Sequence, residues 1–419
     1  MVAEQIKAKL EEILNPDTLL DSRERPSFIF DEFADEDNAF YEELSKGDVN
    51  QSRAEDIAKI VAQRFGVISK DPHIRGSNRS LFVSVRPEGS QLELRLKGFN
   101  APNQIYKNKQ HIDFLRAKGG AGYNAAIGYG GGEEHPLYLV MFSGADRPVI
   151  DRSADSKRTD PLPTDLNDIL DFIKSYSLNK DHIGPTENIK LHLDLVESGI
   201  ARRISISEAL NDNQKYYWIE KISKVISNIK GLVRKESSMW VLSDALLENF
   251  VKLENNDGKK QWTITDQGYS EGQLNDWKQK YDLSPEEALS ASFYGRFEYN
   301  LGQLFFSLRL RENIDRHITE LFSQRMLTLV ESGIFNKGRE TDIGKPRSGK
   351  QIPGDHNPSL SHSYFYLGIL EQVMCDMART GEVPASNSLA QGLLYTIDKA
   401  PYDISDKLTD GIRRGKSYL

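Results

Sequence analysis

The sequence predicts a chain of mixed α and β class: an α+β or α/β N-terminal unit, then a mainly helical C-terminal part with a winged-helix-like insertion. Three patterns predict this class. Residues 80–86 (SLFVSVR) and 91–97 (QLELRLK) alternate apolar and polar side chains as β-strands do. Beyond residue 160, apolar side chains recur mostly at helical spacing. Residues 237–268 read as a helix and then two short strands, which is the order of a winged helix.

Length and composition restrict the class of protein. A chain of 419 residues predicts two or three domains, and 38% hydrophobic with 28% charged residues is typical of a soluble globular protein. The single cysteine, Cys375, excludes an intrachain disulfide, and its apolar neighbours favour a packing role. The net charge of −8 argues against a protein that coats nucleic acid through its overall electrostatic field, but it does not exclude binding through local basic patches. No apolar run is long enough for a membrane span and no signal peptide is recognisable, so we expect a cytoplasmic protein without membrane contact.

Residues 1–150 are predicted to form the N-terminal unit. The two alternating segments flank Pro87-Glu88-Gly89-Ser90 and predict a β-hairpin over residues 79–97. Residues 107–120 predict a helix closed by glycine, and residues 135–144 (HPLYLVMFSG) predict a buried strand. The unit therefore combines a sheet with helices.

A glycine-rich stretch follows the predicted helix. Seven of the fourteen residues from 119 to 132 are glycine, with Tyr123 and Tyr129 among them. A dinucleotide fingerprint is excluded because a helix, not a strand, precedes the glycines. Two interpretations remain: a flexible connector into the next strand, or a loop whose bare backbone approaches a phosphate or a base while the tyrosines stack on it.

The hairpin carries the candidate catalytic residues. Glu93, Arg95 and Lys97 lie on one face of the second predicted strand, opposite its leucines. Metal-dependent nucleases use acids to hold Mg²⁺ and a lysine beside the attacking water. We therefore predict Glu93 and Lys97 as catalytic. Asp71 or Glu88 could supply the second acid; we choose Asp71, so that Asp71 and Glu93 are the predicted metal ligands. The alternative is an exposed, salt-bridged strand face.

The polar, proline-containing segment 145–166 predicts a domain boundary near residue 150. We expect a helical, winged-helix-like domain over residues 151–282 and a helical C-terminal domain over residues 283–419. In the predicted wing, Lys259 and Lys260 follow a turn at Asn256-Asp257-Gly258. The last 85 residues open with a basic loop that contains Arg347 and Lys350, and these four cations suit phosphate contacts.

These patterns together predict a nucleic-acid-binding protein of bacterial or phage type, a metal-dependent restriction or defence endonuclease. The predicted cofactor is Mg²⁺, and the predicted partner is nucleic acid, with DNA favoured over RNA. Tyr123, Tyr129, Lys259, Lys260, Arg347 and Lys350 are the predicted contacts. The alternative is a non-catalytic structural or assembly subunit of a phage or defence complex, which would bind protein partners or form a homo-oligomer.

Overall fold

The protein is described by a computed structural model of residues 1–419. The description covers residues 28–29, 55–56, 58–59, 62, 66–75, 80–86, 94–98, 126–130, 138–142, 163–178, 183–242, 244–254, 260–264, 278–280, 282–284, 287–288, 293–308, 316–332 and 357–399. The chain divides into two compact units. The first contains Met1–Thr159 and Glu248–Gly268, and the second contains Asp160–Leu247 and Tyr269–Leu419.

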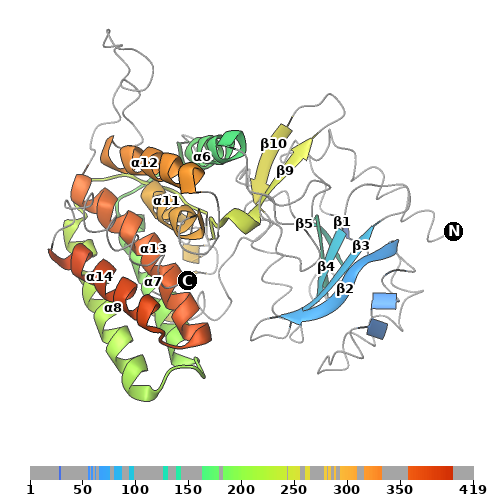
Figure 1. Ribbon diagram of the computed structural model, residues 1–419, viewed down its shortest axis with the longest axis horizontal. Coiled ribbons are helices and arrows are strands. Elements are labelled where there is room, and N and C mark those ends of the chain that lie inside the picture. The colour runs from blue at the N-terminus through green and yellow to red at the C-terminus, as the bar shows by residue number, and fades with distance from the viewer. Residues whose placement is uncertain are drawn as a thin grey trace, which may run out of the picture. The chain divides into compact units, whose positions relative to one another are not determined.

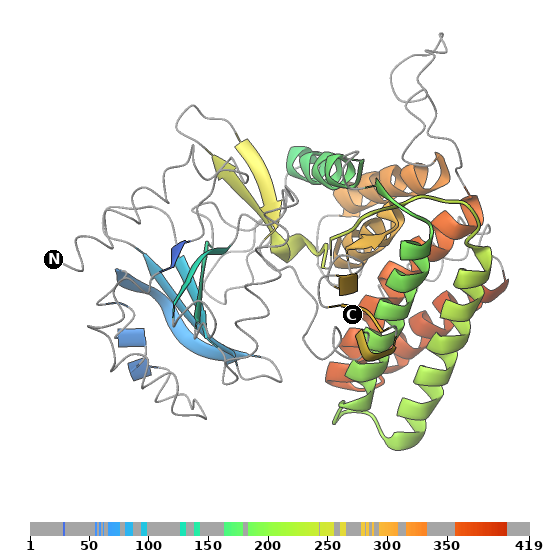
Figure 2. The same cartoon turned by 180° about the vertical axis from the view of Figure 1, so that it is seen from behind.

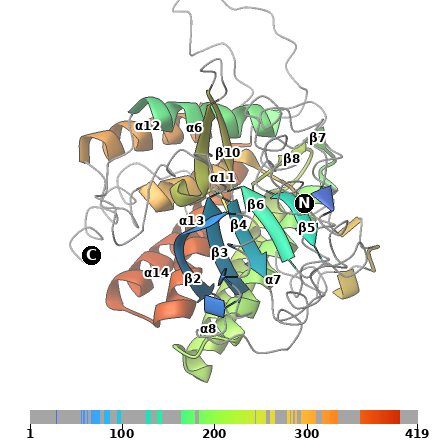
Figure 3. The ribbon, with the colours of Figure 1, turned by 90° about the vertical axis from the view of Figure 1, so that its right-hand side faces the viewer.

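A six-stranded sheet organises the first unit (Figure 3). Its strands lie in the order β1-β5-β6-β4-β3-β2, and all neighbours are antiparallel except β1 and β5. The bounds are β1 Phe28–Ile29, β2 Val67–Arg75, β3 Ser80–Arg86, β4 Leu94–Gly98, β5 Ala126–Gly130 and β6 Tyr138–Phe142.

The hairpin predicted over residues 79–97 is confirmed by the antiparallel pairing of β3 with β4. Leu81, Val83 and Val85 of β3 are at most 1% exposed, and in the ladder Val83 lies opposite Leu96 and Val85 opposite Leu94. Alternation accounts for the buried apolar positions of β3, because side chains along a strand point to opposite faces in turn.

The glycine-rich stretch differs from the prediction. Its residues 126–130 are not a loop but the strand β5, which pairs with β1 on one side and β6 on the other. The register between Ala126 and Gly128 is irregular, as expected where a glycine accommodates a β-bulge. Both interpretations of residues 119–132 as a loop are therefore wrong for these five residues; Tyr123 lies outside the described residues.

The predicted wing is a genuine hairpin, but the winged helix is not formed. β9 (Phe250–Glu254) and β10 (Lys260–Ile264) pair antiparallel, as predicted. The residues before them form the strand β8 (Ser238–Trp240), an irregular segment and the short 3-10 helix η4 (Leu247–Asn249), where a helix was expected. Within the described residues, the sequence order of a winged helix is thus absent.

Seven helices of eight or more residues are described in the second unit (Figures 1 and 2). A small antiparallel sheet accompanies them, with β8 between β7 (Ile183–Gly184) and β11 (Tyr294–Gly295). The helices are α6 Pro163–Leu178, α7 Glu187–Ser205, α8 Asp212–Leu232, α11 Phe297–Phe306, α12 Arg316–Ser332, α13 Pro358–Thr380 and α14 Pro384–Lys399.

Local signals fix several helix ends. Asn211 and Gln214 form a capping box at the start of α8, and the Asn357 side chain accepts a hydrogen bond from the Leu360 amide at the start of α13. Gly381, with φ of 86°, ends α13 in the left-handed region that favours glycine. The turn between α13 and α14 is therefore encoded locally.

α13 is the central helix of the second unit, with α7, α8, α11, α12 and α14 packed against it. α11 is buried over its whole length and crosses α13 closely at Gly302 and Gly368. A Cβ at Gly302 would lie 2.0 Å from the Phe365 carbonyl oxygen, and one at Gly368 would lie 2.2 Å from the Tyr299 carbonyl oxygen. Only glycine allows these backbones to approach so closely.

The predicted boundary near residue 150 lies close to the division at 159, whereas the one predicted at 282 falls inside the second unit. There α13 packs against α7 and α8 across that sequence boundary. The mixed α and β class is confirmed in its coarse form, as a mainly helical chain with small sheets. No described helix is both long and apolar enough to cross a bilayer.

Candidate functional site

Two of the three predicted nuclease residues, Asp71 and Lys97, lie on described strands that are not neighbours in the sheet. Asp71 is an exposed residue of β2, at an irregularity in its pairing with β3. Lys97 lies on β4 opposite Phe82 of β3, so one strand separates it from β2, which corresponds to about 10 Å between backbones. Glu93 precedes β4, outside the described residues. No group of three or more His, Cys, Asp or Glu side chains suited to a metal occurs in the described part of the chain.

The predicted nucleic-acid contacts are only partly described. Tyr129 lies on β5, paired with Leu139 and Ile29, and Lys260 begins β10 opposite Glu254. Trp262, also on β10, is 6% exposed. The other predicted contacts, Tyr123, Lys259, Arg347 and Lys350, fall in ranges that the structure does not describe.

The polar side chains that the structure does assemble lie inside the second unit, on α11 and at its C-cap residue Ser307. Asn300 accepts a hydrogen bond from the Leu242 amide (2.9 Å) and donates one to the Leu242 carbonyl (2.7 Å). Gln303 accepts from the Ala245 amide (3.1 Å), and Ser307 accepts from the Leu247 amide (3.1 Å). These side chains satisfy buried backbone groups of segment 242–247, whose described residues, 242 and 244–247, form no strand. Their role is structural.

A buried ion pair lies at the N-terminal end of α11. Arg296 and Glu298 are 3% and 0% exposed and are joined by two hydrogen bonds of 2.9 and 3.2 Å. Ser361 of α13 donates to the same carboxylate (2.8 Å). Burial alone would raise the pKa of Glu298, but the Arg296 guanidinium and these donors hold it below its ordinary value. The side-chain nitrogen and oxygen atoms of this pair all have hydrogen-bond partners inside the protein, which favours a structural role.

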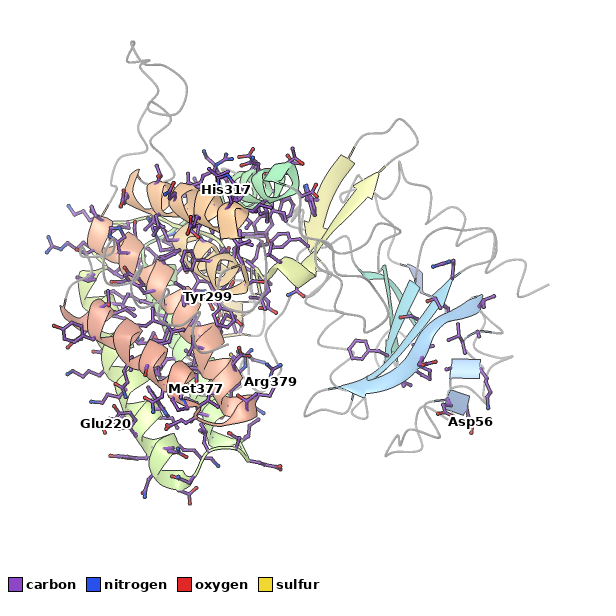
Figure 4. All side chains as sticks on the ribbon, in the orientation of Figure 1. Asp56, Glu220, Tyr299, His317, Met377 and Arg379 are labelled. Carbon is purple, nitrogen blue, oxygen red and sulfur yellow. The ribbon has the colours of Figure 1, made fainter. Side chains whose placement is uncertain are left out.

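Glu371 of α13 is the centre of a second polar cluster. It accepts hydrogen bonds from Tyr299, labelled in Figure 4, and from Gln303 (3.1 Å). Arg203, 45% exposed, lies 3.7 Å from it and also donates to the Cys375 sulfur. The cluster links α7, α11 and α13. It offers no free nucleophile, because desolvation raises the pKa of the Cys375 thiol to about 12.

A direct prediction follows for Cys375. Only the thiolate attacks alkylating reagents, so at pH 8 this thiol should react on the order of a thousandfold more slowly than an unperturbed cysteine. Iodoacetamide modification followed by mass spectrometry measures the rate, and the same protein in urea provides the control. Equal rates in the folded and unfolded protein would contradict the prediction.

His192 of α7 is fully buried between aromatic rings. Its imidazole meets Tyr299 edge-on at 5.0 Å and stacks on Tyr364 at 5.9 Å, measured between ring centroids. Neither of its nitrogens has a hydrogen-bond partner in the structure. Burial lowers the pKa of His192 to about 3, so the ring is neutral at physiological pH.

One exposed region also stands out. Seven large hydrophobic side chains of the described residues are exposed, and five of them lie on neighbouring segments of the second unit. Ser207 donates to the Ala378 carbonyl (2.5 Å), Trp218 to Glu382, and Gln391 to the Tyr217 hydroxyl (2.6 Å), so these segments are joined. We call this region the tyrosine surface; it consists of Ile206, Tyr216, Tyr217, Val383 and Tyr395.

Sequence reasoning missed both the buried and the exposed sets. The polar positions 296, 300, 303 and 307 recur at helical spacing in an otherwise apolar segment, and this was the signal available for the buried side chains. For the tyrosine surface the sequence offers only the adjacent pair Tyr216 and Tyr217, since its other members are brought together by the fold.

Comparison with known proteins gives only distant similarities. No family model and no curated protein matches the sequence. Among solved structures, an aminoglycoside-3'-phosphotransferase of type VIII shares 13% identity, with a TM-score of 0.40 over 75% of this chain and 98% of that one. A Plasmodium vivax ethanolamine kinase shares 10% (TM-score 0.38, 90% and 99% covered). A glucosamine kinase in complex with glucosamine, ADP and inorganic phosphate shares 8% (TM-score 0.29, 89% and 84% covered).

The predicted function is corrected by these findings. The winged helix on which DNA binding depended is not formed among the described residues, and the matched structures named above are kinases, not nucleases or DNA-binding proteins. The prediction of a nucleic-acid-binding protein or magnesium-dependent defence endonuclease was therefore wrong, and its alternative, a subunit of a phage or defence complex, finds no support there either. At these TM-scores we transfer neither the substrates nor the reactions of the kinases to this chain.

Proposed function

We propose that the second unit binds another protein molecule through the tyrosine surface. The single observation that carries this proposal is the clustering of five of the seven exposed large hydrophobic side chains on joined segments of one unit. Isolated exposed apolar residues are ordinary on soluble proteins, but a cluster of them favours an interaction surface.

The composition of the surface suits protein recognition. Tyr216 is 73% exposed and Tyr395 is 59% exposed. Tyrosine is enriched at protein interfaces because it provides a large contact area with few rotatable bonds and a hydroxyl for hydrogen bonding. The Tyr217 ring is already held by Gln391 and has the Lys221 ammonium 5.4 Å from its centroid. Binding would therefore require little ordering of this side chain.

Protein capture with matched variants tests the proposal. The full chain, immobilised, is exposed to an extract of the cells that produce it, beside a Tyr216→Ala, Tyr395→Ala double variant. Two truncated interface tyrosines should weaken binding by at least about 2 kcal/mol, or roughly thirtyfold. Leu321→Ala is the control, because Leu321 is also exposed (53%) but lies on α12, outside the tyrosine surface.

The expected result is a protein retained by the parent chain and by Leu321→Ala but lost with the double variant, as measured by quantitative mass spectrometry. If all three chains retain the same proteins in the same amounts, the tyrosine surface is not a binding surface and the proposal fails.

A further inference from the structure

The outward side of α8 carries a regular stripe of exposed residues. The stripe follows the spacing 4, 3, 4, 3, 4 along the helix, so its members lie on one face. Its members are all exposed: Asn213, Tyr217, Glu220, Lys224, Ser227 and Gly231. Glu220, labelled in Figure 4, lies in the middle of it. We call these six residues the α8 stripe.

The two flanks of α8 are already occupied. On the stripe itself, Gln391 of α14 donates to the Tyr217 hydroxyl (2.6 Å) and leaves part of the tyrosine exposed. On one flank, Ser223 donates to Glu197 of α7 (2.6 Å) and Lys230 pairs with Asp194 (2.6 Å). On the other, Asn228 donates to Asp398 of α14 (2.6 Å). The side opposite the stripe is the buried one, formed by Trp218, Ile222, Val225, Ile226 and Ile229. The stripe thus faces away from the unit's own core.

The stripe is complementary to itself when a second α8 is laid antiparallel across its midpoint at residue 222. Glu220 then faces Lys224 of the partner subunit, and by symmetry Lys224 faces the partner's Glu220. The ring of Tyr217 faces the small Ser227 of the partner subunit, and Asn213 faces the partner's Gly231. Opposite charges meet at the central level and unequal sizes at the two outer levels, which makes the stripe complementary to itself, as an isologous two-fold contact requires.

Two further properties agree with this arrangement. Glu220 and Lys224 make no ion pair with another described residue of their own chain, so both charges are available to a partner. A Cβ at Gly231 would meet nothing within 4 Å, so packing within the protomer does not require glycine there. A parallel pairing is disfavoured, because it would place Glu220 against Glu220 and Lys224 against Lys224.

We infer that a second copy of this chain binds along the α8 stripe, antiparallel and with two-fold symmetry. The inference rests on the proposed protein-binding function, because the stripe shares Tyr217 with the tyrosine surface, and it names the partner. The Glu220–Lys224 pairs set the direction and register of the contact. The exposed tyrosine supplies apolar area beside them.

A charge exchange tests the inference on the full chain. Sedimentation equilibrium should show a dimer for the parent protein. Glu220→Lys alone places lysine against lysine twice by symmetry, and Lys224→Glu alone places glutamate against glutamate twice. Each single variant should raise the dimer dissociation constant by at least about tenfold, and the double variant Glu220→Lys, Lys224→Glu should return it to within about threefold of the parent.

The control makes the same charge change off the stripe. Lys190→Glu alters an exposed residue of α7 and should leave the dissociation constant unchanged. Because Glu220, Lys224 and Ser227 are exposed, all variants should keep the parent's melting temperature. Ser227→Arg places a large side chain opposite Tyr217 of the partner subunit, so it should also weaken the dimer. A monomeric parent up to about 100 µM, a level at which a specific homodimer forms, or a double variant as weak as the single ones, overturns the inference.

The two proposals fail in different ways. If the parent is monomeric but the Tyr216→Ala, Tyr395→Ala variant still loses a captured protein, the second copy is the wrong partner and the binding surface stands. If the parent is monomeric and capture is also unchanged, both proposals fall.

Discussion

Replacing Gly302 or Gly368 by alanine is expected to destabilise the second unit by about 3 kcal/mol or more. The new methyl group would lie 2.0 or 2.2 Å from a carbonyl oxygen of the facing helix, and a backbone atom cannot move aside as a flexible side chain can. The two helices must separate instead, which opens the core around them. For a unit of this size, 3 kcal/mol corresponds to a fall in melting temperature of roughly 10 °C.

Gly392→Ala is the matched control for this effect. Gly392 is also a helical glycine, on α14, but a Cβ there would meet nothing within 4 Å. Alanine restricts the unfolded chain and favours the helix, so this variant should be more stable by about 0.5 to 1 kcal/mol. Thermal unfolding followed by circular dichroism compares the three variants. Equal melting temperatures would show that the close crossing of α11 and α13 does not stabilise the unit.

The second large effect concerns acid and His192. The folded state keeps this imidazole neutral until its pKa of about 3, whereas in the unfolded chain it binds a proton below about pH 6.5. The unfolded state therefore binds more protons between these values, and stability falls as the pH falls from 6.5 towards 3. The loss amounts to roughly 1.4 kcal/mol per pH unit, or about 2 kcal/mol at pH 5.

His192→Leu should remove this part of the pH dependence. Because neither imidazole nitrogen has a hydrogen-bond partner, the substitution leaves no donor or acceptor orphaned, and its effect at pH 7 should be small. Urea unfolding at pH 7 and pH 5 measures the change in the free energy of unfolding for both proteins. The variant should lose about 2 kcal/mol less than the parent over this interval. Identical losses would contradict a buried, neutral His192.

What the sequence could predict was local. The hairpin of β3 and β4 follows from alternation within twenty residues, and the helices α7 and α8 follow from their apolar spacing and, for α8, a capping box. β5 could not be recognised in the same way. Its hydrogen-bond partners include Phe28 and Ile29, about a hundred residues earlier, and its own glycines and alanine disfavour a strand when read alone.

Segment 242–247 was misread for the same physical reason. Its apolar residues suggested a helix, which would satisfy its own backbone, but the backbone groups are bonded instead to side chains of α11 about sixty residues later. The buried polar residues around α11 were harder still to predict from the sequence. Arg296 and Glu298 are charged residues in a short span and would ordinarily be read as exposed, and only the fold reveals that they neutralise each other in the core.

The side chains of α11 that hold segment 242–247 also decide how this part of the molecule opens. A strand in a sheet can exchange its amide hydrogens when its own ladder frays, but the amides of Leu242, Ala245 and Leu247 are covered by a helix buried along its whole length. They are released only when α11 itself leaves the core, so the segment and the helix belong to one cooperative opening unit. Slow exchange at these three amides, which lie in neither an α-helix nor a strand, is the signature of that coupling.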